Sequence, residues 1–162
     1  MIFLQPKHKS IMSKKITAIL LSAVMTVILS AICSGQDRLP KGAPVEMNKE
    51  MFLERITDYK NNPDEFKYLG DKPALIDFYA TWCGPCKQVA PIVADLAKEF
   101  SGRIRVYKID IDKEPELAKL FGIQSIPSFL FIPKKGEPKM VVGAMDRKTF
   151  REAINANLFG KE

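Results

Sequence analysis

The chain has 162 residues, of which 46% are hydrophobic and 27% charged, a composition that is ordinary for one globular domain and argues against a disordered protein. Its formal net charge of +6 comes mostly from four lysines near the start, which have no acidic residue among them (Lys7, Lys9, Lys14 and Lys15). Without those lysines the charge is +2, so the composition gives no basic footprint for a polyanion and we expect no nucleic-acid partner.

The first 35 residues have the layout of a secretory signal peptide. Lys14-Lys15 is followed by an uncharged apolar run over residues 16–32 and then by small residues. We therefore expect export to the periplasm, with residues 1–35 removed and Gln36 as the first residue of the mature protein. Met12 would serve as an alternative start, with the preceding residues as an upstream extension.

Two alternatives to simple cleavage stay open. The apolar run could remain as a membrane anchor, although its 17 residues are fewer than the roughly 20 that a spanning helix needs. Cys33 could instead be lipidated, as in bacterial lipoprotein signals, although Ile32 stands where those signals carry a small residue. If cleavage follows Gly35, the mature protein keeps only Cys83 and Cys86.

Residues 36–44 are polar and contain two prolines and a glycine, which predicts a linker before a folded domain over residues 45–162. Hydrophobic periodicity and capping residues predict the elements of that domain. In chain order they are a helix from Asn48 to Tyr59, a strand over 74–80, a helix from the cysteines to Phe100 that is kinked at Pro91, a strand over 104–111, a helix over 114–121, a hairpin of strands over 128–132 and 139–142, and a helix over 149–158. This order predicts an α/β fold, a mixed β-sheet with helices on both faces.

The segment Cys83-Gly84-Pro85-Cys86 lies where a predicted strand ends and a predicted helix begins. A zinc site is excluded because the one histidine is His8 and there is no second cysteine pair, and the same shortage excludes histidine-based nucleophilic catalysis. A purely structural disulfide across two residues would remove little loop entropy and stabilise the fold weakly. The pair is therefore interpreted as a redox couple that needs no metal and no cofactor.

The two cysteines have different expected roles. Cys83 would face the unpaired N–H groups at the helix start, which favour the nucleophilic thiolate. Cys86, one turn further in and expected to be more buried, would attack a mixed disulfide formed at Cys83. Gly84 would let a partner's backbone approach closely, and Pro85 suits the first turn of a helix and stiffens the pair.

The hexapeptide Trp-Cys-Gly-Pro-Cys-Lys at residues 82–87 resembles the active-site motif of the thioredoxin family, and the resemblance covers about residues 45–160. Further positions match that family: Asp77 its buried acid, Lys108 the lysine near that acid, Pro91 its kinked helix, Ile126-Pro127 its cis-proline and Gly143 its late glycine. Two departures concern partner preference more than chemistry. Tyr79 stands where thioredoxins usually carry a second tryptophan, and residues 61–72 form a longer segment than in minimal members.

The resemblance implies a thioredoxin fold and a monomeric enzyme that reduces disulfides of client proteins through the Cys83–Cys86 pair. An oxidase or isomerase, and a non-catalytic binding module on the same scaffold, are the alternatives. The Gly-Pro pair between the cysteines and Ile126 before the proline resemble the reducing branch, whereas export leads to a compartment where disulfides persist. Reduction there requires a donor, and we expect a membrane-embedded dithiol carrier.

Alternation along the strand places Asp77 on the face opposite Ile76 and Phe78, where burial would raise the pKa of its carboxyl. We expect Asp77 to accept the proton of Cys86, with Lys108 as its electrostatic partner. The expected catalytic residues are Cys83, Cys86, Asp77 and Lys108. The expected substrate-binding residues are Trp82, Gly84, Pro85, Ile126, Pro127 and Gly143, and the Ile126 backbone would pair with an extended client segment.

Overall fold

The computed structural model describes residues 39–160. The expected signal peptide over residues 1–35, its alternative start at Met12 and the candidate lipidation site Cys33 lie outside the described residues. In the described part of the chain, every helix is too short or too polar to span a bilayer.

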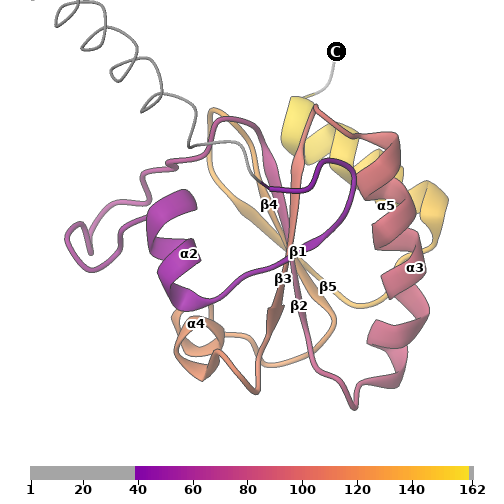
Figure 1. Ribbon diagram of the computed structural model, residues 1–162, viewed down its shortest axis with the longest axis horizontal. Coiled ribbons are helices and arrows are strands. Elements are labelled where there is room, and N and C mark those ends of the chain that lie inside the picture. The colour runs from indigo at the N-terminus through magenta and orange to yellow at the C-terminus, as the bar shows by residue number, and fades with distance from the viewer. Residues whose placement is uncertain (1–38, 161–162) are drawn as a thin grey trace, which may run out of the picture. The chain divides into compact units, whose positions relative to one another are not determined.

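The core of the fold is a five-stranded mixed sheet (Figure 1). In chain order its strands are β1 (Val45–Glu46), β2 (Ala74–Tyr79), β3 (Arg105–Asp110), β4 (Ser128–Ile132) and β5 (Lys139–Val142). Their spatial order is β1-β3-β2-β4-β5, with β3 parallel to both β1 and β2, and β4 antiparallel to both β2 and β5. This arrangement confirms the predicted mixed sheet and places β2 at its centre.

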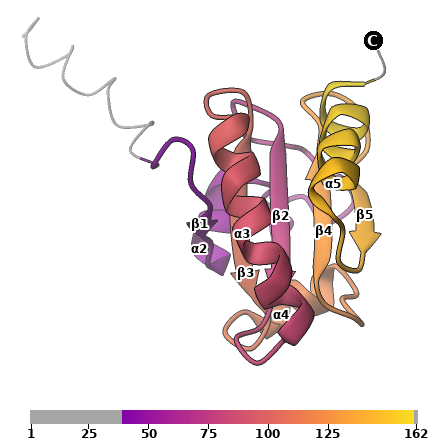
Figure 2. The same ribbon diagram turned by 90° about the vertical axis from the view of Figure 1, so that its right-hand side faces the viewer.

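Helices cover both faces of the sheet, as predicted. They are α2 (Lys49–Arg55), α3 (Gly84–Glu99), α4 (Pro115–Leu120) and α5 (Arg147–Ile154), the last continuing as the π-helix η2 (Asn155–Phe159). Figure 1 shows α2 and α4 on one side of the sheet and α3 and α5 on the other. Figure 2 shows α3 and α5 in front of the strands.

Three elements differ from the sequence-based prediction. The two-residue strand β1 was not predicted, and it extends the sheet beyond β3. The helix expected to reach Tyr59 ends at Arg55, because the Ile56 N–H still bonds to the Phe52 carbonyl while the Ile56 carbonyl accepts from Leu69. The last helix begins two residues earlier than expected, since the Asp146 side chain caps it by accepting from the Thr149 N–H at 2.7 Å.

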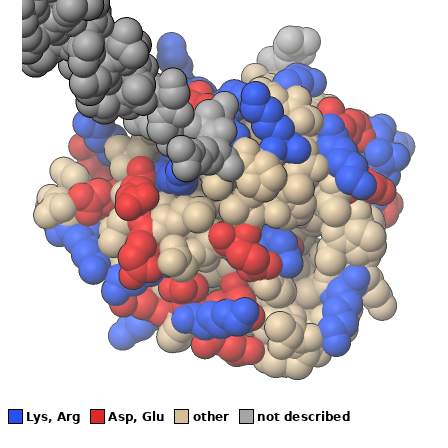
Figure 3. All heavy atoms as spheres, in the orientation of Figure 1, with Lys and Arg blue, Asp and Glu red and all other residues tan. Residues whose placement is uncertain are grey.

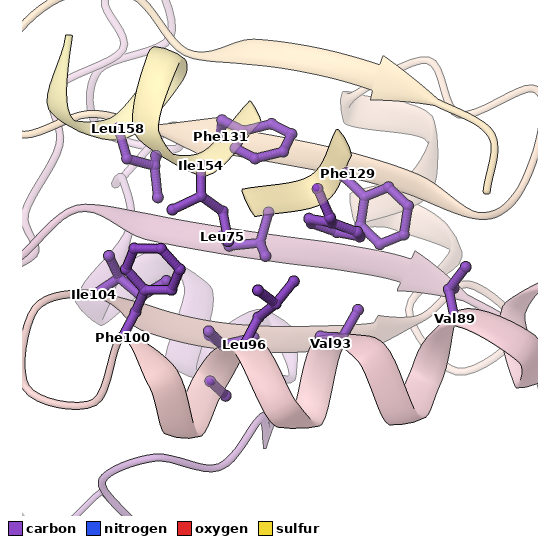
Figure 4. Close-up of a cluster of buried hydrophobic side chains, with 13 residues drawn as sticks. Leu75, Val89, Val93, Leu96, Phe100, Ile104, Phe129, Phe131, Ile154 and Leu158 are labelled. Carbon is purple, nitrogen blue, oxygen red and sulfur yellow. The ribbon is translucent and has the colours of Figure 1, made fainter. Parts of the chain in front are cut away.

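Successive residues of β2 point to opposite faces of the sheet. Leu75 joins the large apolar cluster under α3 and α5, where Figure 4 shows it between Leu96 of the helix and Phe131 of β4. Phe78 lies on the other face, with its ring centroid 5.5 Å from that of Phe121 at the end of α4. Asp77 therefore shares the α3/α5 face with Leu75, opposite Ile76 and Phe78 as predicted.

Basic and acidic side chains are interspersed over the face of the molecule that Figure 3 shows. Surface charge of this kind gives little steering toward a polyanion.

Candidate active site

Both cysteines lie at the beginning of α3, directly after the loop that leaves β2. Cys83 is the N-cap residue, and its Sγ accepts the backbone N–H of Cys86 at 3.1 Å. Pro85 occupies the first turn, where its missing N–H leaves no helix bond unmade. The structure contains the oxidised pair, with a Cys83–Cys86 disulfide and Cα atoms 5.3 Å apart. The predicted placement of a redox pair at a helix N-terminus is confirmed.

The prediction that Cys86 is the more buried cysteine is wrong for this oxidised state, because each residue is 4% exposed. The Cys83 Sγ is covered from the side by the loop before β4 and lies 3.9 Å from the Ile126 carbonyl oxygen. Ala80 and the two cysteines form a small buried cluster with Ile126, Tyr79 and Ile111 packed against it. Access to the disulfide is therefore restricted to its outer edge.

The residues that flank the disulfide form an open rim. Trp82 is 66% exposed, and its indole N–H donates to Asp112 Oδ2 at 2.8 Å, which fixes the ring while leaving it accessible. Gly84 and Pro85 are exposed. A Cβ at Gly84 would meet no atom within 4 Å, so the space that the missing side chain leaves is open to an approaching partner.

A second part of the rim comes from the turn before β4 and the end of β5. The Ile126–Pro127 peptide bond is cis, as expected, and the Pro127 carbonyl accepts the Gly143 N–H at 2.8 Å. Among residues 39–160, neither backbone group of Ile126 bonds to another backbone group. Gly143 has φ of 101°, a left-handed conformation that favours glycine.

Val142 was missed by the sequence analysis. It is a large apolar residue exposed at the end of β5, and the strand register places it beside Ser128, one residue after the cis-proline. The match of Gly143 to the family's late glycine could have drawn attention to Val142, the residue before it. Together, Trp82, Ile126 and Val142 give the rim an apolar character.

Asp77 is the one buried carboxyl on this face of β2. It is 2% exposed, and within the described residues its Oδ1 has no hydrogen-bond partner. The pKa of Asp77 is raised to about 7, mainly because the carboxyl is buried. The charge of Lys108 has a smaller effect that lowers this pKa, and the charge of Glu46 has a still smaller effect that raises it. The predicted buried acid with a raised pKa is present, and its pKa is close to neutral pH, where a general base works best.

Lys108 lies directly opposite Asp77 in the parallel β2–β3 register, yet its ammonium pairs elsewhere. Lys108 Nζ is 3.2 Å from Glu46 Oε1 and 3.9 Å from the centroid of the Tyr79 ring. The Tyr79 hydroxyl donates to the same Glu46 carboxylate at 3.0 Å. Sequence reasoning missed Glu46, because its strand has only two residues and is too short to show an alternation of apolar and polar side chains.

The described residues hold no group of three or more metal-ligating side chains. The chemistry available at this site is that of the disulfide itself, with a buried carboxyl on the same face of the sheet. Such an arrangement can exchange disulfides with a partner that docks on the apolar rim.

Comparisons with known proteins agree with this geometry. The thioredoxin family model matches residues 47–156. A thioredoxin of Borreliella burgdorferi is 43% identical over 116 residues, which cover 72% of this chain and 97% of that protein. A thioredoxin of Staphylococcus haemolyticus is 39% identical over 109 residues, which cover 67% of this chain and 100% of that protein.

Solved structures show the same fold. A mutant thioredoxin from Halobacterium salinarum aligns with a TM-score of 0.57 at 28% identity, covering 74% of this chain and 94% of that one. A chloroplastic thioredoxin z aligns with a TM-score of 0.57 at 27% identity, covering 70% of this chain and 92% of that one. The predicted thioredoxin fold is confirmed, and the chain belongs to the thioredoxin family of protein-disulfide oxidoreductases.

Proposed function

We propose that the protein is an exported, monomeric thioredoxin that reduces disulfides of client proteins in the bacterial envelope. The observation that carries this proposal is the position of Cys83 as the N-cap of α3 beneath an open apolar rim. The export signal in the sequence supports the compartment, and the Gly84-Pro85 pair between the cysteines supports the reducing direction.

The first step is attack by the reduced enzyme. The Cys83 thiolate attacks one sulfur of the client disulfide, the client S–S bond breaks, and one client thiolate leaves. The free N–H groups at the start of α3 stabilise the Cys83 thiolate; in the oxidised structure the Cys86 N–H already points at this sulfur. The product of this step is a mixed disulfide between Cys83 and the client.

The second step releases the client. The Cys86 thiol loses its proton to the Asp77 carboxylate, directly or through water, and the resulting thiolate attacks Cys83 Sγ. The mixed disulfide breaks, the second client sulfur leaves and takes up a proton, and the Cys83–Cys86 disulfide forms. Two electrons pass from the enzyme to the client in the cycle. A base whose pKa is about 7 is half ionised at neutral pH and can serve this transfer in both directions.

The rim residues provide the client-binding surface. Trp82, Val142 and Ile126 supply apolar contact, and Gly84 lets the client backbone come close. An extended client segment would pair with the Ile126 backbone, in the manner of strand addition. The backbone conformation of this surface is set by three residues that have no polar side chain, namely Pro85, Pro127 and Gly143.

Each turnover leaves the pair oxidised, so continued reduction outside the cytoplasm requires a donor. We propose that a membrane-embedded dithiol carrier re-reduces Cys83 and Cys86. The test is rapid acid quenching of living cells followed by alkylation of free thiols. A reductase predicts a substantial reduced fraction that disappears when the donor is deleted. A pair that is fully oxidised in growing cells, together with a purified protein that oxidises clients faster than it reduces them, would establish the oxidase alternative.

Export has a test of its own. N-terminal sequencing of the protein from the native envelope should give a chain that begins near Gln36. A blocked, lipid-modified Cys33 would support the lipoprotein alternative. A chain that keeps residues 16–32 in the membrane fraction would support the anchor, and a full-length chain in the cytosol would refute export.

A further inference from the structure

Three side chains form a polar cluster at the edge of the site, which we call the Glu46 cluster: Glu46 of β1, Lys108 of β3 and Tyr79 at the end of β2. The Glu46 carboxylate accepts from the Tyr79 hydroxyl at 3.0 Å and pairs with Lys108 Nζ at 3.2 Å. The Lys108 ammonium also lies 3.9 Å from the centroid of the Tyr79 ring, a cation–π contact. Each member therefore contacts the other two.

We propose that Glu46 and Tyr79 are positioning residues, which hold the Lys108 ammonium on the β1 side of β3 and so keep Asp77 ready to exchange a proton near neutral pH. The inference rests on the proposed function, because it concerns the residue that serves there as proton acceptor for Cys86.

The strand register aligns the side chains of Glu46, Lys108 and Asp77. Glu46 is paired with Lys108 across β1–β3, and Lys108 is paired with Asp77 across β3–β2, so the three side chains form one row on the α3/α5 face. The ammonium in the middle of this row could pair with either carboxylate. Within residues 39–160 its ion pair is with Glu46, while Asp77 Oδ1 is left without a partner.

Tyr79 explains why the ammonium lies on that side. Its hydroxyl fixes the Glu46 carboxylate, and its ring provides an electron-rich surface for the ammonium. Burial and the bond to Glu46 both raise the pKa of Tyr79, so the hydroxyl remains a donor throughout the physiological range. An indole at this position would offer its N–H from a different place on the ring, and the hydroxyl contact would be lost.

The other elements around Asp77 add no competing charge. On β4 its partner in the register is the apolar Phe129, and the buried residues of α3 are Cys86 and apolar side chains. The charged groups that act on Asp77 are Lys108, which lowers its pKa, and Glu46, which raises it. Loss of the Glu46 charge would remove the raising effect and free Lys108 to move toward Asp77. Both consequences lower the pKa of Asp77.

The size of the effect follows from the geometry. Glu46 and Asp77 are two strands apart, or about 10 Å between backbones. A unit charge at this distance, partly screened by solvent, changes a neighbour's pKa by roughly half a pH unit to one pH unit. Release of Lys108 toward Asp77 adds to this change.

The test is a direct titration of the Asp77 carboxyl carbon by NMR in the reduced protein. Glu46→Gln should lower the pKa of Asp77 by about half a pH unit or more, and Tyr79→Phe should lower it by less. Glu50→Gln is the matched control, because it removes an exposed carboxylate from α2 and should leave the titration unchanged. If Glu46→Gln moves the titration no more than Glu50→Gln does, the inference is wrong.

A second measurement separates positioning from simple charge. In a Lys108→Met background, Glu46→Gln should produce a smaller fall than in the parent, because no ammonium is left to release. Equal falls in both backgrounds would overturn the positioning role of Glu46. The titration needs no client, so it decides the inference even if the protein fails to reduce disulfides, which would overturn the proposed function alone.

Discussion

Asp77 and Phe78 are neighbours on β2, yet they lie on opposite faces of the sheet and have opposite effects on stability. Phe78 is fully buried against Phe121, and an apolar ring in such a place stabilises the fold. Asp77 is almost as buried, but its carboxyl has an unsatisfied oxygen and a raised pKa, so it destabilises the fold whenever it is ionised. Under the proposed function, the acid that serves proton transfer therefore costs stability when it is ionised, whereas its neighbour on the other face adds to stability.

The largest expected effect on activity comes from replacing the cysteines on the α3/α5 side of the sheet. Cys83→Ser should abolish disulfide exchange, because the N-cap thiol that attacks the client is lost. Cys86→Ser should still attack but be unable to release the client, so it should accumulate mixed disulfides. Non-reducing gels of client mixtures measure this accumulation. Trapping by Cys83→Ser in place of Cys86→Ser would reverse the two roles.

On the opposite face, Phe78→Ala should lower the free energy of unfolding by about 3–5 kcal/mol, as expected for a buried ring that leaves a cavity. Urea unfolding of the oxidised protein measures the loss. The rate of disulfide reduction per folded molecule should stay close to that of the parent. A large loss of that rate in fully folded Phe78→Ala would break the division of roles between the faces.

Asp77→Asn should have two opposite consequences. The native carboxyl keeps its proton up to about pH 7, whereas the unfolded one releases it near 3.8, so the parent loses stability as pH rises between these values. The variant lacks this loss, so above pH 7 its free energy of unfolding should exceed that of the parent by at most about 4 kcal/mol. Below pH 4 the free energies of unfolding of the two proteins should differ least.

The same substitution should slow disulfide reduction near neutral pH, because the proton acceptor for Cys86 is gone. Rates measured from pH 6 to 9 on parent and variant check this expectation. Identical profiles would leave Asp77 with a structural role only.

Trp82→Ala should have the smallest effect on the fold, because the ring is 66% exposed. The free energy of unfolding should change by less than about 1 kcal/mol. The effect should fall on client binding, with kcat/KM for a protein disulfide lowered by roughly tenfold, since an exposed aromatic contact contributes about 1–2 kcal/mol to association. A small-molecule disulfide, which does not cover the rim, provides the control and should react at the parental rate.

Much of this architecture could be predicted from the sequence, because its signals are local. The apolar run of β2 and the capping position of Cys83 each depend on a few adjacent residues. The parts that could not be predicted depend on partners distant in sequence. β1 exists because Val45 and Glu46 pair with β3, and two residues show no period.

The same reason explains the incomplete prediction of the site. The position of Asp77 in an apolar strand was enough to predict its burial and the direction of its pKa. The pairing of Lys108 with Glu46 was hidden, because the two residues are 62 positions apart and only the sheet brings them together. Val142 was hidden as well, since the exposure of an apolar strand residue at a sheet edge depends on the surrounding fold.

The central claim, that Cys83 and Cys86 form a reducing pair, is tested most directly by a redox titration against glutathione. The purified protein is equilibrated in buffers of graded glutathione ratio, and the reduced fraction is read after acid quenching and alkylation. We expect a reduction potential near that of thioredoxin, about −270 mV, which is well below the glutathione poise of an oxidising compartment. A value near the about −120 mV of a strong dithiol oxidant would contradict it, because such a pair would drive electrons from clients into the enzyme.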